Sequence, residues 1–392
     1  MPIANSIAAA AEHLAEWRQD LHRHPEIGFD EHRTAGVVAE KLRSFGFHDV
    51  QEGIGRTGVV GVLHGRTGPG GEEKAIMLRA DMDALPIVEE SGAAYTSANE
   101  GVMHACGHDG HTTMLLGAAE HLAETRAFDG TVYFCFQPAE ENFGGADAMI
   151  KDGLFKKFPC RAMYGMHNLP GLAVGEFSTR AGPILAACDE FFINITGLGG
   201  HAAEPHDCRD PIVCASEIVQ SIQSIVSRRI APREPCVVSV TQFHAGDANN
   251  VIPQTVKLSG TVRSFDEEVH RTIYVEMKRI VEQVCAAHAC TGEVDNGHVY
   301  YPPTINDPSE TEFCVDVARE VAGENAVADD LPLSLGSEDF AFYAREKPAC
   351  FVMIGNGDSA LLHHPKYDFD DTATPWGASF FARLVERALP MG

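Results

Sequence analysis

The segment His104–His111, which reads H-A-C-G-H-D-G-H, gathers side chains that bind metal ions and transfer protons. Cys106 and His108 are two residues apart, so in an extended segment both side chains point the same way and can reach one ion. Thiolate and imidazole are ligands that zinc and its borderline neighbours prefer. An apolar helical pattern follows, and the positive end of that helix would favour a thiolate at Cys106. Taken alone, the segment is more typical of a buried cysteine beside surface histidines.

Further candidate ligands follow apolar runs that predict strands. Glu140 and Glu141 come after T-V-Y-F-C-F-Q-P, His167 ends M-Y-G-M-H, and His363 and His364 follow F-V-M-I-G and a short loop. Neighbouring residues in extended backbone point to opposite sides, so one glutamate can bind metal while the other holds a water. Singly, each is typical of a surface acid pair or a structural histidine. Together they indicate one site, because open α/β sheets place their sites beyond the carboxyl ends of strands.

Two aspartates in R-A-D-M-D-A-L-P, Asp81 and Asp83, end another predicted strand. Carboxylates commonly orient metal-binding histidines through hydrogen bonds, and we expect that role here. The acids of D-D-L-P-L-S-L-G-S-E-D, residues 329–339, are expected to cap a helix and to be solvated.

Composition limits the class of protein. The chain has 392 residues, which favours two domains, and its 44% hydrophobic and 22% charged residues are typical of a globular protein. The formal charge of −26 argues against nucleic acid or an anionic membrane as a partner. The 11 cysteines include no C-x-x-C pair and are typical of reduced thiols in the cytoplasm. No apolar run reaches the roughly 20 residues of a membrane helix, and the amino-terminal segment lacks the pattern of a signal peptide.

The order of the predicted elements divides the chain. Residues 1–187 and 301–392 alternate apolar strands with helices, which predicts an α/β catalytic domain with a central, mostly parallel mixed sheet flanked by helices. Its expected helices include residues 6–23, 31–45, 109–125, 338–345 and 375–388. Residues 188–300 read β-α-β-β-α-β, with the last strand near 293–300. That order is typical of a ferredoxin-like α+β unit, here inserted as a lid or dimerisation domain, because an exposed sheet edge invites pairing.

Ten motifs along nearly the whole chain resemble those of the M20 metallopeptidases. Within that family, the motifs resemble those of the branch that contains the aminoacylases, the hippurate hydrolases and the indole-acetyl-amino-acid hydrolases. The motifs are H-R-H-P-E-I-G-F-D-E-H-R-T-A (22–35), R-A-D-M-D-A-L-P (79–86), M-H-A-C-G-H-D-G-H (103–111), F-Q-P-A-E-E (136–141), M-H-N-L-P (166–170), G-L-G-G-H-A-A-E-P-H (197–206), N-V-I-P (250–253), G-T-V-R-S-F (260–265), G-S-E-D-F-A (336–341) and L-H-H-P-K-Y-D-F (362–369).

The resemblance implies a role for each candidate residue. It implies two divalent ions bridged by Cys106. Zinc is the expected metal, and manganese, nickel and cobalt are alternatives. The remaining ligands would be His108, Glu141, His167 and His363; the L-H-x-P pattern selects His363 over His364. Glu140 corresponds to the general base of the family. His201 corresponds to the family histidine that stabilises the oxyanion in the site of the partner subunit of a dimer. Asn250 and Arg263 would hold the substrate carboxylate, although a salt bridge from Arg263 to Asp266 or Glu267 is an equal alternative. His104 and His111 are taken as structural or as supports of the ligands.

The implied activity is hydrolysis of N-acyl-L-amino acids such as hippurate to a carboxylic acid and an amino acid. The enzyme is expected to be cytoplasmic and to form a homodimer or a dimer-based oligomer. A metallocarboxypeptidase or dipeptidase uses the same machinery and remains open. A non-catalytic metal or ligand binder and a closed structural zinc site are the alternatives from other classes. The presence of Glu140 beside Glu141 argues against both, because a binder has no use for a base next to its ligands.

Overall fold

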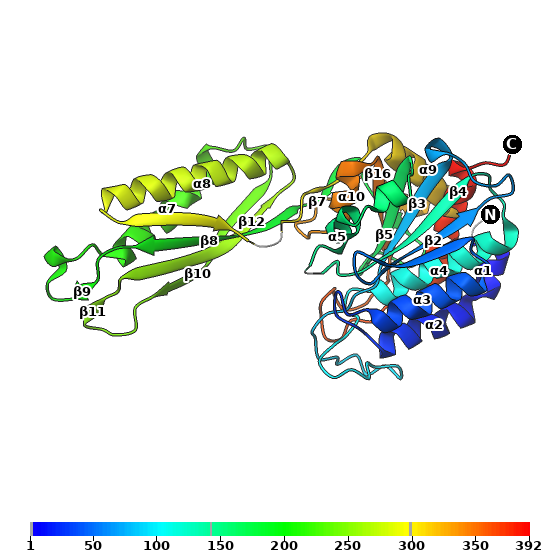
Figure 1. The fold of residues 1–392 in the computed structure, drawn as a ribbon, viewed down its shortest axis with the longest axis horizontal. Helices are drawn as coiled ribbons and strands as arrows, with labels where there is room; N and C mark the ends of the chain where they lie inside the picture. The colour runs from blue at the N-terminus through cyan, green and yellow to red at the C-terminus, as the bar shows by residue number, and fades with distance from the viewer. Residues whose placement is uncertain (1–2, 142, 298–299) are drawn as a thin grey trace. The chain divides into compact units, whose positions relative to one another are not determined.

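The computed structural model describes residues 3–141, 143–297 and 300–392, and the chain divides into two compact units. Unit 1 comprises Met1–Ile184, Ile305–Pro332 and Asp339–Gly392, and unit 2 comprises Leu185–Thr304 and Leu333–Glu338. Figure 1 shows the elements of each unit. Among the described residues, no helix combines the length and the apolar character needed to cross a membrane.

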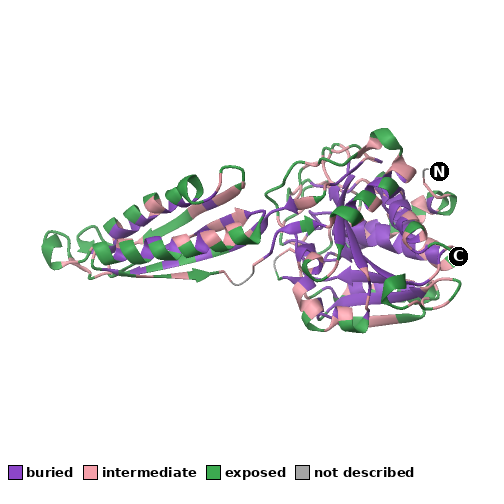
Figure 2. Cartoon of the chain, turned by 90° about the horizontal axis from the view of Figure 1, so that it is seen from above, coloured by how far each residue is buried: buried purple, intermediate pink, exposed green. Residues whose placement is uncertain are grey.

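Unit 1 is built around one mixed eight-stranded sheet. In sheet order its strands are β1 (Asp49–Ile54), β2 (Gly58–His64), β4 (Thr131–Gln137), β3 (Ala75–Asp81), β5 (Ala162–Leu169), β16 (Ala349–Gly355), β6 (Phe177–Ser178) and β15 (Val327–Ala328). The central strands β4, β3, β5 and β16 run parallel to one another. They carry apolar runs without polar alternation and, except for Leu169 at the end of β5, are buried (Figure 2), as strands covered on both faces must be.

Helices cover both faces of this sheet (Figure 1). They are α1 (Asn5–Ala9), α2 (Ala11–Arg23), α3 (His32–Ser44), α4 (His108–Thr125), α5 (Gly145–Lys151), α6 (Leu154–Lys157), α9 (Pro308–Ala322), α10 (Phe340–Glu346) and α11 (Thr374–Ala388). Met166 of β5 lies under Gly377 of α11, whereas Phe340 of α10 lies against the preceding residue, Gly165. Successive residues of a strand face opposite ways, so α10 and α11 cover opposite faces. The expected α/β class with a large, mostly parallel sheet is therefore confirmed.

Unit 2 contains a four-stranded antiparallel sheet in the order β10 (Cys236–Ala245), β12 (Thr255–Ser264), β8 (Ala187–Thr196) and β13 (Thr291–Asn296). Helices α7 (Pro211–Arg228) and α8 (Glu267–Ala287) pack on it through apolar stripes. Along β8 burial alternates residue by residue, which is why its period of two was visible in the sequence. The chain order β8-α7-β10-β12-α8-β13 agrees with the predicted β-α-β-β-α-β unit.

The remaining strands form two small sheets, and some element limits differ from expectation, most clearly at the first helix and at the last strand of unit 2. The small sheets pair β11 (Val251–Ile252) with β9 (Gly200–His201) and β14 (Thr304–Asn306) with β7 (Gly182–Leu185). The helix expected over 6–23 is divided between α1 and α2 at Ala10. The strand expected near 293–300 is β13, which ends at Asn296; residues 298–299 of that prediction lie outside the described part of the chain.

Candidate metal centre

The ligand atoms of Cys106 and His108 lie close together, but the backbone between them has a conformation that the sequence did not suggest. The expected extended segment is wrong: Gly107 has φ = 92° and precedes α4, so His108 is the first residue of that helix. A Cβ at position 107 would lie 2.3 Å from Asn168 Nδ2 and 2.5 Å from the Tyr367 hydroxyl. Glycine is therefore required twice, for its left-handed backbone and for the close approach of the neighbouring loops.

The five predicted ligands gather at the carboxyl ends of the parallel strands of unit 1. Cys106 Sγ lies 3.3 Å from His167 Nε2, and Glu141 Oε1 lies 3.3 Å from His363 Nε2. His108 Nε2 lies 3.8 Å from the same Glu141 oxygen. Their ligand atoms fall into overlapping groups within 4.8 Å, namely Cys106 with His108 and His167, and Cys106 with Glu141 and His363. Cys106 is thus shared by both groups of candidate ligands.

His108 Nε2 provides the test of whether a metal ion fits. This buried nitrogen has no hydrogen-bond partner among the described residues. It faces carboxylate oxygens of Asp81, Glu140 and Glu141 at 3.8, 4.0 and 3.8 Å, too far for hydrogen bonds. Two ligand atoms on one tetrahedral zinc ion, each about 2.0–2.3 Å from it, lie roughly 3.3–3.7 Å apart. The oxygens around His108 Nε2 lie slightly beyond that range, whereas the separations of Cys106 from His167 and of Glu141 from His363, each 3.3 Å, match it. Together with the unpartnered nitrogen and the mixed sulfur, nitrogen and oxygen donors, this spacing fits a cation of this kind.

The other ring nitrogens of these histidines are held by protein groups. His108 Nδ1 contacts Asp83 Oδ1 at 3.1 Å, and His167 Nδ1 donates to the Asn168 carbonyl at 2.7 Å. Both contacts direct Nε2 toward the centre, which is how outer partners fix metal-binding imidazoles. His111 differs, because Nδ1 contacts Asp81 at 2.6 Å while Nε2 accepts from the Asn168 amide at 2.9 Å. With both nitrogens engaged, His111 is a support of the centre.

The carboxylates set the electrostatics of the centre. Burial raises the pKa of the Cys106 thiol well above its usual range, and the charges of Glu141 and Glu140 raise it further. The expected thiolate-stabilising effect of the α4 terminus is therefore outweighed in the protein alone. Burial lowers the pKa of His108, but the carboxylates of Asp81, Asp83 and Glu141 prevail and raise it to about 10. The site thus favours positive charge, and a cation would be needed to hold a Cys106 thiolate.

A turn separates the two glutamates from β4. Ala139 has φ = 54°, and Glu140 and Glu141 follow in a turn, so the expected extended backbone is wrong at this point. The two carboxylates nevertheless lie on the same side as His108 Nε2, at 4.0 and 3.8 Å. Glu140 is buried, with 5% of its surface exposed, and the Glu141 amide donates to Asp83 Oδ2 at 3.0 Å. Glu140 is therefore placed within reach of a molecule bound at the centre.

His363 and His364 occupy different surroundings. His363 has φ = 64°, donates its amide to the Ala105 carbonyl at 2.8 Å and presents Nε2 to Glu141. His364 instead uses Nδ1 to accept the Lys366 amide at 3.0 Å, closing a turn. The geometry accordingly favours His363 as the ligand. His104 is buried, with neither ring nitrogen hydrogen-bonded to a described residue, and burial lowers its pKa to about 4.

A buried charge network beneath the centre was missed by sequence reasoning. Arg79 donates from Nε to Gln137 Oε1 at 2.8 Å, from Nη1 to Asp81 Oδ2 at 2.6 Å and from Nη2 to Asp339 Oδ1 at 3.2 Å. The expectation that Glu338 and Asp339 are solvated is wrong, because 2% and 0% of their surfaces are exposed. Asp339 also accepts from the Ala146 amide. The available signal was Arg79 itself, since an arginine that follows an apolar run within a buried strand needs a buried acidic partner.

The remaining predicted residues belong to unit 2. Val251 of β11 pairs with His201 of β9, and the Ala202 amide donates to the carbonyl of Asn250 at 3.1 Å, so His201 and Asn250 lie close together on one exposed tip. Arg263 lies elsewhere, on β12, where its guanidinium donates to Thr261 Oγ1 and to the Val262 carbonyl. Asp266, one of the alternative partners of Arg263, caps α8 through the amides of Glu268 and Val269.

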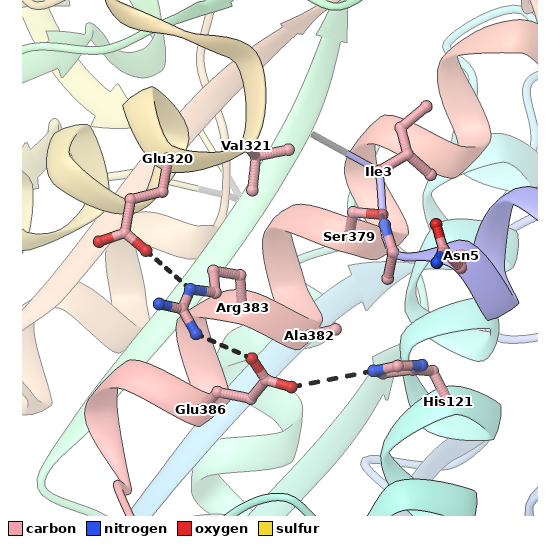
Figure 3. Close-up of a pocket in the computed structure, with 10 residues that line it drawn as sticks. Ile3, Asn5, His121, Glu320, Val321, Ser379, Ala382, Arg383 and Glu386 are labelled. Atoms are coloured by element: carbon pink, nitrogen blue, oxygen red, sulfur yellow. Dashed lines mark hydrogen bonds and ion pairs between the residues drawn. The ribbon is translucent and has the colours of Figure 1, made fainter. Parts of the chain in front are cut away.

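A separate pocket of about 600 Å³ in unit 1 contains none of the predicted site residues. Figure 3 shows its lining, in which Arg383 lies between Glu320 and Glu386 and the latter reaches toward His121. These charged groups pair with one another across the pocket.

Comparison with known proteins gives one consistent result. The model of peptidase family M20/M25/M40 matches residues 77–387. A hippurate hydrolase from Campylobacter jejuni is 41% identical over 95% of each chain, and a thermostable carboxypeptidase from Saccharolobus solfataricus is 36% identical over 98% of this chain and 97% of its own. A Bacillus subtilis crystal structure, described as a dinuclear metal binding peptidase from the M20 family, superposes with a TM-score of 0.85 at 33% identity and covers 97% of this chain and 99% of its own.

Proposed function

The chain belongs to peptidase family M20/M25/M40, and on that premise we propose that it is a metal-dependent hydrolase of N-acyl-L-amino acids. Hippurate represents the substrate class, and the products would be a carboxylic acid and an amino acid. One observation carries the proposal: the buried His108 Nε2 faces Glu141 on one side and a second carboxylate, Glu140, at 4.0 Å. A closed structural site needs ligands and no additional carboxylate, so Glu140 is the feature that favours catalysis.

We propose that Cys106, His108, Glu141, His167 and His363 would hold two divalent ions, with Cys106 belonging to both groups of candidate ligands. Zinc suits this mixture of donors best, and manganese, nickel or cobalt is compatible with it. When bound, the ions would polarise the scissile carbonyl and lower the pKa of a water molecule toward about 7. The relative described as dinuclear supports the number of ions.

The chain's own residues would perform the proton transfers and hold the substrate. Glu140 accepts a proton at its carboxylate and returns it to the nitrogen of the departing amino acid, so that the amine leaves neutral. His201 is proposed to donate a hydrogen bond to the oxygen that becomes negative as the carbonyl is attacked. Asn250 and Arg263 would bind the free carboxylate of the amino acid, a group that a guanidinium matches in bidentate fashion.

Unit 2 is proposed to act as a lid and as the dimerisation domain, with His201 serving the partner's site. Support comes from the exposed apolar residues Leu198, Phe243 and Val251, which lie near His201 in the chain or in the outer strands of this unit. We propose a homodimer, or an oligomer built from it. The eleven cysteines, none of which forms a disulfide in the structure, support a reducing compartment such as the cytoplasm.

The first test measures amine release from benzoyl-, acetyl- and indole-acetyl-amino acids and from dipeptides. Each substrate is tested with enzyme that has been treated with a chelator and with the same enzyme after zinc or manganese is restored. We expect chelator-sensitive cleavage of the acyl-amino acids in preference to the dipeptides. Preference for dipeptides would assign the protein to carboxypeptidase-like or dipeptidase activity, and metal binding without any cleavage would leave a non-catalytic binder.

Two variants separate the roles of the residues. Glu140→Gln should keep its metal and lose about 10²- to 10⁴-fold in kcat, the usual contribution of a general base. His363→Ala should lower the metal stoichiometry, whereas the adjacent His364→Ala is the matched control and should retain it. A Glu140→Gln protein that turns over normally would refute the mechanism.

A further inference from the structure

Glu31 places a buried carboxylate against the segment that carries Glu140. None of its surface is exposed. Its Oε1 accepts the backbone amide of Ala139 at 2.8 Å, and its Oε2 accepts the hydroxyl of Thr57 at 2.5 Å. Glu31 is 108 residues away from Ala139 in the chain, so this contact ties the start of α3 to the end of β4.

The local sequence leaves the Glu31 side chain available for this contact. Glu31 is the residue before α3, where a side chain commonly caps the free amides, yet it makes no capping bond. Glu26 does so instead, because its two oxygens accept the amides of Arg33 and Thr34 at 2.9 and 2.8 Å. These amides at the start of the helix therefore have hydrogen-bond acceptors without Glu31, whose carboxylate makes its hydrogen bonds elsewhere.

Ala139 is the residue whose backbone decides where Glu140 points. It is one of the few non-glycine residues with a left-handed backbone, at φ = 54°, a conformation that persists only when its surroundings hold it. Its carbonyl accepts the Gly145 amide at 3.0 Å. A Cβ on Gly28 would come within 2.9 Å of Ala139, so the chain is packed tightly against this turn.

The residue after Glu140 is tied in the same manner. The Glu141 amide donates to Asp83 Oδ2 at 3.0 Å, while Asp83 Oδ1 contacts His108. Two buried carboxylates from separate parts of the chain therefore fix the amides on either side of Glu140. Asp83 also contacts a proposed ligand, whereas the described contacts of the Glu31 side chain are to Ala139 and Thr57.

We propose that Glu31 is a positioning residue that directs the carboxylate of Glu140 by holding the amide of Ala139 in its left-handed turn. The role rests on the proposed function, in which Glu140 transfers the proton. A general base acts only within hydrogen-bond reach of its proton, and a misplacement of about 1 Å can cost roughly 100-fold in rate. Loss of the Glu31 contact should therefore lower kcat while the ligands and the substrate-binding groups stay in place.

The test compares Glu31→Ala, Glu31→Gln and Thr57→Val. Glu31→Ala removes the acceptor for Ala139, and we expect kcat to fall about 100-fold with metal stoichiometry unchanged and KM within about threefold of wild type. Glutamine keeps an oxygen for the Ala139 amide, so Glu31→Gln should restore kcat to within about threefold of wild type. Thr57→Val is the matched control, because it removes the other hydrogen bond of Glu31 and leaves Ala139 tied.

Hydrogen exchange provides a readout that does not depend on turnover. Peptides spanning residues 138–146 should lose amide protection in Glu31→Ala and keep it in Thr57→Val. Should Glu31→Ala fail to fold, Glu31→Leu fills the space, removes the same acceptor and is expected to give the same result.

Each outcome has one meaning. Equal kcat values for Glu31→Ala and Thr57→Val, or a loss of activity that follows loss of metal, would overturn the role of Glu31. A wild-type protein that binds metal and cleaves none of the substrates would instead overturn the proposed function.

Discussion

Glu31 should make the stability of unit 1 fall as the pH rises, and Glu31→Gln should remove that dependence. Burial raises the pKa of this carboxyl to about 7, with the negative charge of Asp83 acting in the same direction and the hydrogen bonds from Thr57 and the Ala139 amide opposing it. In the unfolded chain the value is near 4.5. The folded state therefore binds the Glu31 proton more tightly than the unfolded state, so stability is lost between these two pH values.

The size of the effect follows from the two pKa values. One pKa unit corresponds to about 1.4 kcal/mol, so a difference of roughly 2.5 amounts to about 3 kcal/mol. The free energy of unfolding of Glu31→Gln, relative to wild type, should rise by that amount from about pH 4.5 to about pH 7.5. Any constant cost of the altered hydrogen bonds cancels, because only the change with pH is compared.

Tryptophan fluorescence during urea unfolding measures unit 1 selectively, because both tryptophans of the chain, Trp17 and Trp376, belong to that unit. Wild type and Glu31→Gln are compared at a series of pH values. A difference between them that stays constant from about pH 4.5 to 7.5 would show that Glu31 is ionised in the fold at low pH, and would refute the reasoning.

Two further predictions concern residues that the fold places under constraint. Asp339→Asn removes the negative charge opposite the buried guanidinium of β3 and should destabilise unit 1 by about 3–5 kcal/mol in the same urea assay, whereas the exposed Asp330→Asn should change little. Gly107→Ala should lower both stability and metal stoichiometry, because its Cβ would lie 2.3 Å from Asn168 Nδ2. The control is Gly101→Ala, which measures the backbone cost alone, because Gly101 has a similar φ of 81° and open space around it. Equal losses in the two alanine variants would contradict the clash.

The sequence predicted those parts of the fold that repeat locally. Apolar strands alternating with helices identified unit 1, and the alternation now seen along β8 identified the antiparallel sheet of unit 2. The candidate ligands could be chosen from the sequence because each belongs to a short motif, and those motifs lie beyond strands or at the start of a helix. They are Cys106, His108, Glu141, His167 and His363.

The contacts that join distant segments were not predictable from local patterns. Asp339 is 260 residues from Arg79, and its own segment reads as an exposed acidic run. Gly107 was one glycine among 37, and only the approach of Asn168 and Tyr367 makes a side chain impossible there. Glu31 resembles an ordinary acid at a helix start until Glu26 is seen to cap that helix.

These distant contacts explain how acidic side chains are buried together beneath one edge of a sheet. Asp81, Asp83, Glu140 and Asp339 are each at most 5% exposed, and buried carboxylates of like charge raise one another's pKa unless a cation compensates them. Arg79 supplies that compensation in the lower part of the cluster, where it binds both Asp81 and Asp339. Above it, Glu141 and Glu140 face His108 Nε2 at 3.8 and 4.0 Å. The guanidinium thus offsets part of the charge of the lower acids, and we expect metal ions bound beside the upper carboxylates to stabilise unit 1.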